Sequence, residues 1–352
     1  MSKKAHSFDM EVIAMSKITD RIKIGELEFL LADKDMPITL DGTMVPLKNP
    51  DGTWNFITCD LGEKPYHHKF IGTPDDIYRR HGFCTMDANG HWDTYPSGIW
   101  PWSAYKCDDG MIFCFCHREL LSRTDPNFRN YFFTGIAVSY DNGDNWKYLG
   151  DILGTPRNGT TMEVGNMGGL PMFVKDDYIY IYFNDHCKDG SRKWISAARM
   201  KLSETIAAVK EGKLPTVRKY SGTGRWDTDP FDEMGASILP IVDGINPDSH
   251  SKGVYIRPLD RFMMTMQTGS VGKLVAYLSQ DGEHFDDFMV IDENDEKLMQ
   301  PYSFFISTDG DCTDDMREVG KEFYIYFPHK GTGHNDKTYI YDEQYRRKIT
   351  IE

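Results

Sequence analysis

The eight residues from Ser139 to Trp146 read Ser-Tyr-Asp-Asn-Gly-Asp-Asn-Trp, and they constrain the fold of this chain more than any other stretch. Asn142 and Gly143 can adopt positive φ, so a tight hairpin forms there at low cost. The carboxylate of Asp141 can accept hydrogen bonds from N–H groups of the turn, and Trp146 can pack beneath it. This pattern is that of an Asp-box hairpin, which joins two antiparallel strands.

A second, degenerate copy of the motif runs from Ser279 to Phe285, with Phe285 in place of the tryptophan. Two copies at corresponding points of a repeated strand pattern indicate the blades of a β-propeller. The motif is structural, so it is evidence for the fold and not for the chemistry.

Strand-like runs separated by turn signals recur along the chain. Three of them consist almost wholly of aromatic and other apolar residues: Met111–His117, Tyr178–Phe183 and Phe323–Phe327. Such runs are typical of strands buried on both faces, as in a blade stacked between its neighbours. The pattern restarts near residues 35, 100, 168, 235 and 300, at steps of about 65 residues.

These steps suit four-stranded blades with long loops, and five of them fill the 352 residues. We therefore predict an all-β, five-bladed β-propeller with Asp-box turns that forms a single domain over residues 1–352. Residues 1–30 are expected to be an N-terminal extension that packs on the propeller or closes it. The fourth blade is expected to contain a strand at Ser237–Pro240, and the one predicted helix is a surface insertion at Ser203–Glu211.

The formal net charge of −14 disfavours nucleic acid as a partner, because an acidic surface repels phosphate groups. The sequence has no apolar run of about 18 residues, so we expect no membrane partner. The first nine residues lack the apolar segment of a signal peptide. Two locations stay open: the cytoplasm, or export of a chain whose signal peptide has been removed. The oligomeric state also stays open.

The cysteines favour free thiols in a reducing compartment. There are seven, an odd number, and their spacing is not that of a disulfide scaffold. They lie at positions 59, 84, 107, 114, 116, 187 and 312. Because no Cys-x-x-Cys pair occurs, a structural zinc site is not expected. No cofactor and no metal site is predicted, although a structural calcium or other ion in the central channel is left open.

A small propeller binds ligands at one mouth of its central channel, where the innermost strands and their loops deliver polar residues. Asp35 precedes the first such strand, and Asp60 follows the strand after it. Paired carboxylates on neighbouring strands are what glycoside hydrolysis needs, one as nucleophile or base and the other as proton donor. The alternative is that each aspartate only caps a turn.

Glu163 lies in a glycine-rich segment just before the third inner strand, which makes it a candidate for an acid with a raised pKa. The alternative is a loop carboxylate in water. Further candidates could bind the substrate rather than react with it: Arg80, His81, Trp100, Trp102, Arg118, Glu119, Asn166, Asp185, Glu233 and Tyr302.

Several of these binding candidates have competing structural roles. Trp100 and Trp102 could stack on sugar rings or fill an interface between blades. Arg118 could clamp a carboxylate or hydroxyl, or merely pair with Glu119. The basic cluster that contains Arg80 could hold an anionic substituent or form a solvated turn.

The order of these motifs resembles a family of bacterial and phage five-bladed propellers that includes endo-D-arabinanases. Four stretches carry the resemblance: Asp35–Gly42 with Trp54–Asp60, the Asp box Ser139–Trp146, Tyr178–Phe183 with Ile195–Leu202, and Tyr220–Trp226. The resemblance implies that the catalytic carboxylates of the family fall on Asp35 and Asp60. This chain departs from the family at the second segment, which typically reads Phe-Gly-Asp-Thr and here reads Thr-Cys-Asp-Leu.

More distantly, the blade pattern is similar to the arabinanase, xylosidase and fructosidase propellers. Those use three acids from three blades, which would suit Asp35, Glu163 and a third acid. We therefore expect a glycoside hydrolase that cleaves a polysaccharide or oligosaccharide, with arabinofuranose-containing glycans as one candidate class.

Two alternatives are retained. One is a non-catalytic carbohydrate-binding or scaffold propeller, since propellers also serve as lectins and scaffolds. The other is a sialidase-like hydrolase, because sialidases share Asp boxes. The sequence contains no clear arginine triad with a Tyr–Glu pair, which that chemistry needs.

Overall fold

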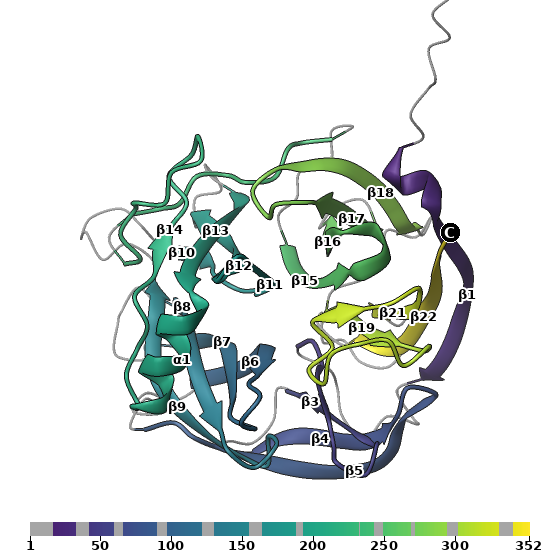
Figure 1. Cartoon of the computed structure of the whole chain (residues 1–352), viewed down its shortest axis with the longest axis horizontal. Coiled ribbons are helices and arrows are strands. Elements are labelled where there is room, and N and C mark those ends of the chain that lie inside the picture. Colours follow the sequence, from purple (N-terminus) through teal and green to yellow (C-terminus); the bar gives the residue numbers. More distant parts are fainter. Residues whose placement is uncertain are drawn as a thin grey trace, which may run out of the picture.

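The computed structural model describes residues 17–32, 42–59, 66–89, 97–121, 130–154, 164–187, 193–231, 233–242, 249–268, 272–293, 302–330 and 341–352. In these ranges the chain is mostly antiparallel β-sheet, and the sheets stand around a common centre in a β-propeller-like ring (Figure 1). Among the described residues, no helix is long and apolar enough to cross a membrane.

The largest sheet contains two antiparallel runs of four strands. One run is β2 (Val45–Lys48), β3 (Trp54–Thr58), β4 (Tyr66–Thr73) and β5 (Asp76–Asp87). The other is β6 (Ser97–Lys106), β7 (Ile112–Leu121), β8 (Asn130–Ser139) and β9 (Asn145–Gly154). A short parallel pairing of β5 with β9 joins the two runs into one hydrogen-bonded sheet.

Two further sheets follow along the chain. The first contains β10 (Val164–Asn166), β11 (Met172–Lys175), β12 (Tyr178–Cys187), β13 (Lys193–Lys201) and β14 (Arg218–Lys219). The second contains β15 (Ser249–Ile256), β16 (Arg261–Thr268), β17 (Lys273–Ser279), β18 (Phe285–Glu293) and the short β20 (Glu318–Val319). A 3-10 helix, Arg257–Leu259, links β15 to β16.

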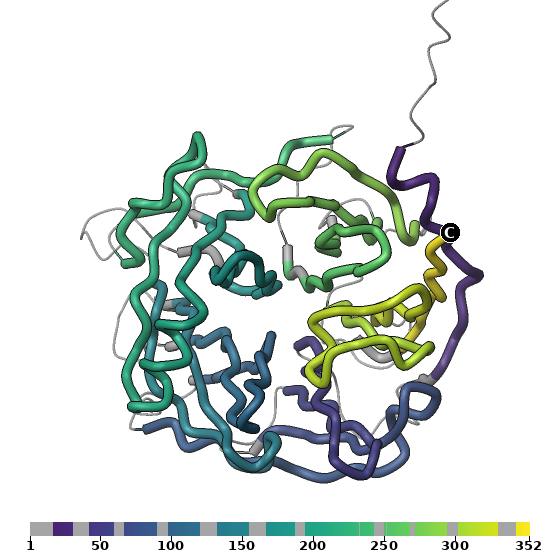
Figure 2. Tube along the Cα trace, in the orientation of Figure 1, coloured from purple at the N-terminus to yellow at the C-terminus, as the bar shows by residue number. Residues whose placement is uncertain are grey.

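The last sheet joins the two ends of the described chain. It contains β19 (Phe304–Ser307), β21 (Glu322–Lys330), β22 (Tyr341–Ile351) and, at its outer edge, β1 (Ile22–Ala32). β1 follows a 3-10 turn at Ile18–Arg21 and pairs antiparallel with β22, with Ile22 opposite Ile351. Figure 2 shows this N-terminal strand in purple running beside the yellow C-terminal strand, so the ring is closed by hydrogen bonds between the two ends.

The centre of the ring is formed by β2, β6, β11, β15 and β19, because residues from each of these strands line one central cavity. Figure 1 shows β6, β11, β15 and β19 on the inner side of the ring. The all-β prediction is confirmed, and the predicted helix is present as α1 (Leu202–Lys210). The hydrogen-bonded sheets number four in the described residues, since β5 and β9 merge two runs, and the division into five blades stays a prediction.

The prediction of a strand at Ser237–Pro240 is wrong. This segment is irregular, and it is fixed by single backbone hydrogen bonds, such as the one from the Ile238 N–H to the Ile195 carbonyl. The innermost strand of that sheet is β15, which begins at Ser249. The apolar residues of the segment, Ile238 and Leu239, are buried against the neighbouring core, which explains why the sequence resembles a strand.

The two turns predicted around Asp141 and Asp281 occupy equivalent positions, between β8 and β9 and between β17 and β18. Asp141 Oδ1 accepts hydrogen bonds from the Ser139 hydroxyl and the Asn145 N–H, both at 2.9 Å. The indole N–H of the buried Trp146 donates to the Gly143 carbonyl at 3.0 Å. The carboxylate and the tryptophan therefore fix the turn as predicted.

A third turn of this kind follows β19. Ser307 Oγ donates to Asp309 Oδ1 at 2.9 Å, and the N–H of Asp311 donates to the same oxygen at 2.9 Å. Sequence reasoning missed it because no aromatic residue stands where Trp146 and Phe285 stand in the other copies.

We predict that Asp141→Ala lowers the free energy of unfolding by about 1–3 kcal/mol, because it removes an acceptor for the Asn145 N–H inside a tight turn. Asp108→Ala is the control, since Asp108 lies exposed in the turn between β6 and β7 and its loss is expected to cost less than about 0.5 kcal/mol. Urea titration of both variants measures the difference. Equal stabilities would show that the carboxylate of Asp141 does not fix the turn.

We also predict that all seven cysteines are free thiols. Six of them form no disulfide in the described residues, and the side chain of Cys187 lies outside these residues. Cys114 and Cys116 are both buried in one apolar cluster, because residues two apart on a strand share a face. Thiol titration in denaturant without reductant should count all seven, and a count of five or fewer in freshly purified protein would contradict the prediction.

Candidate functional site

The N-terminal ends of the innermost strands meet at one end of the ring. Ser103 of β6 donates its hydroxyl to the Leu170 carbonyl at 2.6 Å. Thr43, two residues before β2, donates its hydroxyl to the Ser303 carbonyl, just before β19, at 2.8 Å. Residues that precede these strands or lie within them are therefore neighbours around the centre, although they are far apart in sequence. We call this end of the ring the mouth.

Six side chains gather at the mouth, and we refer to them as the mouth cluster: Trp100, Trp102, His117, Glu119, His250 and Tyr302. Trp102 contacts the other two rings in one half of the mouth cluster. Its ring lies 5.8 Å from that of His250 and 6.0 Å from that of Tyr302, while the rings of His250 and Tyr302 are 5.2 Å apart. Trp102 is only 2% exposed, so it supports the other two rings and does not offer a face of its own.

The other half of the cluster centres on His117. Its Nδ1 lies 2.8 Å from the Met167 carbonyl, and its Nε2 lies 3.0 Å from Glu119 Oε1. The ring of the partly exposed Trp100 is 5.6 Å from the His117 ring. His117 is buried while Glu119 is partly exposed, so this histidine links a carboxylate at the mouth to the backbone of the neighbouring sheet.

The side chains of His250 on β15 and Asn184 on β12 have polar atoms that form no hydrogen bond. Burial, and after it the proximity of His117, lowers the pKa of His250 to about 3, so its ring is neutral. Its Nδ1 is buried and has no hydrogen-bond partner. Asn184, near the end of β12, is 0% exposed, and neither its amide oxygen nor its amide nitrogen has a partner. Such atoms are rare in folded proteins and commonly mark the place of a water or a ligand.

Arg118 does not join the mouth cluster. It alternates with His117 and Glu119 along β7, so its side chain leaves the other face of the strand. There it forms two hydrogen bonds with the carboxylate of Asp151, at 2.8 and 2.7 Å. Asp151 also accepts the hydroxyl of Tyr148 at 2.6 Å. Neither sequence alternative for Arg118 matches this structure, because its partner is Asp151 and not Glu119 or an open site.

Arg80 and His81 also lie apart from the mouth. Both are exposed on β5, the outermost strand of its run, and the His81 ring stacks on that of His68 at 5.1 Å. Arg80 and His81 are consecutive residues of that strand, so their side chains point to opposite faces and cannot act as one cluster.

Two of the acidic candidates support a loop. Asp185 is buried and accepts the N–H of Gly235 at 2.8 Å. Glu233 is exposed, and its backbone carbonyl accepts a hydrogen bond from Lys219 Nζ at 2.8 Å. These contacts hold the segment around residues 233–236 against β12 and β14.

Asp35, Asp60 and Glu163 lie outside the described residues, and so does the side chain of Asn166. Their assignment as catalytic and binding residues stays a prediction. In the described part of the chain, no group of three or more His, Cys, Asp or Glu side chains is placed to hold a metal ion. An ion in the channel also stays a prediction.

Sequence reasoning missed His117, Asn184 and His250. His250 begins β15 just as Tyr302 precedes β19, so the rule that located Tyr302 would have located it too. It was missed because the fourth repeat was expected to begin near residue 235.

No protein-family model and no curated protein matches this sequence. Solved structures with a similar fold were found. The catalytic domain of a GH62 α-L-arabinofuranosidase from Coprinopsis cinerea is 9% identical with a TM-score of 0.52, covering 92% of this chain and 97% of that one. An α-L-arabinofuranosidase from Podospora anserina, solved with cellotriose, is 8% identical with a TM-score of 0.54, covering 92% and 97%.

An α-L-arabinofuranosidase from Lactobacillus brevis is 11% identical with a TM-score of 0.51, covering 90% of this chain and 94% of that one. At these identities the likeness concerns the fold alone. This chain therefore has a fold similar to that of propeller-type glycosidases over nearly its whole length.

We predict that Arg118→Met lowers the free energy of unfolding by about 3 kcal/mol, because it leaves the largely buried carboxylate of Asp151 without its cation. The control is Arg80→Met, which makes the same change on an exposed side chain and is expected to cost less than about 0.5 kcal/mol. Urea denaturation of the two variants measures both values. If both variants lost the same stability, Arg118 would not have the structural role assigned here.

Proposed function

We propose that this protein is a glycoside hydrolase that binds an oligosaccharide or polysaccharide at the mouth and cleaves it with a pair of carboxylates. The observation that carries the proposal is the gathering of aromatic rings and hydrogen-bonding groups without partners at the mouth. A sugar ring offers an apolar face and a rim of hydroxyls, so it needs both kinds of contact. The partly exposed rings of Tyr302 and Trp100 would supply the first, and His250 Nδ1 with the Asn184 amide would supply the second.

The fold similarity to α-L-arabinofuranosidases supports the same proposal and makes arabinofuranose-containing glycans the first substrates to test. We propose five blades, with β2, β6, β11, β15 and β19 as their innermost strands and one domain over the whole chain. We propose that the partner is a carbohydrate and that the protein binds neither nucleic acid nor membrane. This proposal fits the acidic net charge. The location remains as expected from the sequence, cytoplasmic or exported.

The proposed catalytic pair is Asp35 with either Asp60 or Glu163. In the sequence, Asp60 comes two residues after the end of β3, and Glu163 directly precedes β10. An ionised Asp35 would attack or stabilise the oxocarbenium-like centre. Its partner would stay protonated through burial and like-charge repulsion and would donate a proton to the leaving oxygen. A separation of about 5 Å between the pair gives retention, and about 6.5–9.5 Å gives inversion.

We predict that Asp35→Asn abolishes hydrolysis while it preserves the fold and much of the sugar binding, because the amide is nearly isosteric with the carboxylate. A panel of arabinan, arabinoxylan, D-arabinan, xylan and a sialylated oligosaccharide identifies a substrate by the release of reducing ends, and calorimetry measures binding by the variant. Asp60→Asn and Glu163→Gln, made separately, identify the partner acid. Asp75→Asn, in the exposed turn between β4 and β5, is the matched control and should keep full activity.

Near-full activity of Asp35→Asn on a substrate that the wild type cleaves would show that Asp35 is not catalytic. If no glycan in the panel is cleaved while some are bound, the protein is a carbohydrate-binding propeller and the hydrolase proposal is wrong. Cleavage of sialosides alone would point to the sialidase-like alternative.

A further inference from the structure

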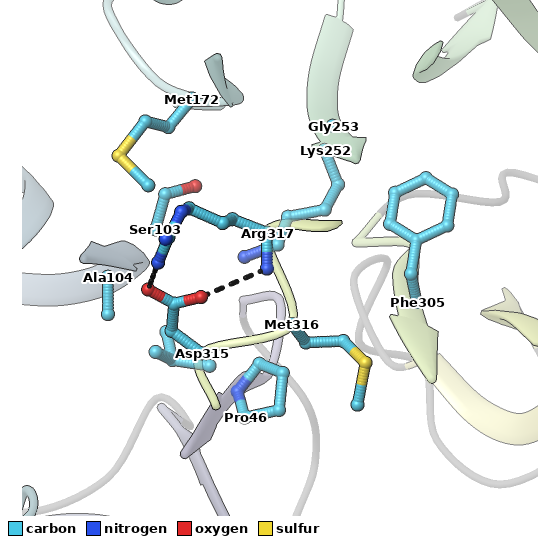
Figure 3. A pocket seen from close by; sticks show the side chains of 11 residues that line it. Pro46, Ser103, Ala104, Met172, Lys252, Gly253, Phe305, Asp315, Met316 and Arg317 are labelled. Carbon is cyan, nitrogen blue, oxygen red and sulfur yellow. Dashed lines mark hydrogen bonds and ion pairs between the residues drawn. The ribbon is translucent and has the colours of Figure 1, made fainter. Parts of the chain in front are cut away.

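A small cavity lies in the channel below the mouth, enclosed by the innermost strands (Figure 3). Its volume is about 20 Å³, and its walls come from all five strands of the centre together with the segment between β19 and β20. A cavity of this size accommodates one or two water-sized particles and no polyatomic ligand of any length.

Lys252 places its ammonium group in the wall of this cavity. The residue is only 6% exposed, and its Nζ donates a hydrogen bond to the carbonyl of Trp102. Among the described residues, no carboxylate lies within ion-pair distance of this Nζ, whereas the buried side chains of Lys69 and Arg118 each have one. Lys252 therefore has a neutral carbonyl as its hydrogen-bond partner, where those two cations have a carboxylate.

The other charges of the cavity wall neutralise each other. Asp315 pairs with Arg317, as the dashed lines in Figure 3 mark, and it also accepts the Lys106 N–H at 2.8 Å. The guanidinium of Arg317 lies 4.4 Å from the centre of the Tyr105 ring. With this pair satisfied, the wall carries one uncompensated positive charge whenever Lys252 is protonated.

A buried ammonium without a counter-charge is costly, so the amine either loses its proton or acquires an anion. Burial lowers the pKa of Lys252 to about 7, and the nearby Cys114 thiol opposes this effect only weakly. The charged groups that face the amine from neighbouring elements are Asp315 and Arg317, which are already paired. The amine consequently has N–H donors to spare and the cavity has room for a single small particle.

We propose that this cavity binds a single-atom inorganic anion of the halide class, held by the ammonium group of Lys252. Chloride fits the volume, and it would supply the negative charge that no described side chain supplies. The proposal concerns the channel and is independent of whether the mouth cleaves glycans.

The stabilisation by halide depends on pH because the pKa of Lys252 differs between the folded and the unfolded chain. Lysine in the unfolded chain keeps its ordinary pKa near 10.5 and is charged throughout the neutral range. The folded amine is charged only below about pH 7, so a halide can bind and stabilise the fold below that pH. The stabilisation by halide is then lost as the pH rises through about 7.

The test compares thermal unfolding of the full chain in sodium chloride and in sodium gluconate at equal ionic strength, since gluconate is too large for the cavity. At about pH 6 we expect chloride to raise the midpoint by about 2 °C, and at about pH 9 we expect no difference. Lys252→Met should abolish the difference at about pH 6. Lys201→Met removes the same charge from an exposed position, and it should keep the chloride effect.

A chloride effect of the same size in Lys252→Met and the wild type, or no effect in the wild type at about pH 6, would overturn the proposal. Should Lys252→Met fail to fold, bromide-soaked crystals of the wild type decide the question. An anomalous peak in contact with Lys252 Nζ supports the site, and a cavity without such a peak refutes it.

Discussion

The pairing of β1 with β22 is the constraint on which the centre of this molecule depends. It brings together segments at opposite ends of the chain, and its loop-closure entropy must be offset by the strand pairing itself. The neighbouring sheet reinforces the closure, because Arg347 of β22 binds Asp292 of β18 at 2.8 and 2.6 Å. Burial alone would raise the pKa of Asp292, but hydrogen bonds from His329 and Arg347 outweigh burial and hold that pKa below its usual range. The carboxylate thus stays charged and ties two sheets together.

Closure matters for the site because the mouth and the channel exist only where the innermost strands meet. Trp102 takes part in both the mouth and the channel. Its ring supports His250 and Tyr302 at the mouth, and its carbonyl accepts a hydrogen bond from the Lys252 amine in the channel below. Lys252 in the channel is therefore bonded to the same residue whose ring supports the rings of the mouth.

The parts of the fold that depend on short-range chemistry could be predicted from the sequence. The turns at Asp141 and Asp281 and the helix α1 are specified by residues within a few positions of each other. Interactions between sheets could not be predicted, since Arg118 and Asp151 meet only after β7, β8 and β9 have paired. The fourth repeat was expected to begin near residue 235, where the chain is irregular. For this reason His250 was not predicted as a site residue. The partly exposed Trp100 and the buried Trp102 look alike in sequence, because their burial is decided by neighbouring sheets.

The groups without partners at the mouth are the strongest argument that this ring is more than a scaffold. Leaving a buried polar atom without a hydrogen bond costs about 1–3 kcal/mol, and Asn184 has two such atoms with His250 adding a third. A leucine or phenylalanine at either position would avoid that cost and fill the same space. A ring selected for stability alone has no reason to retain such groups, whereas a site that exchanges water for the hydroxyls of a ligand needs donors and acceptors that the protein itself leaves open.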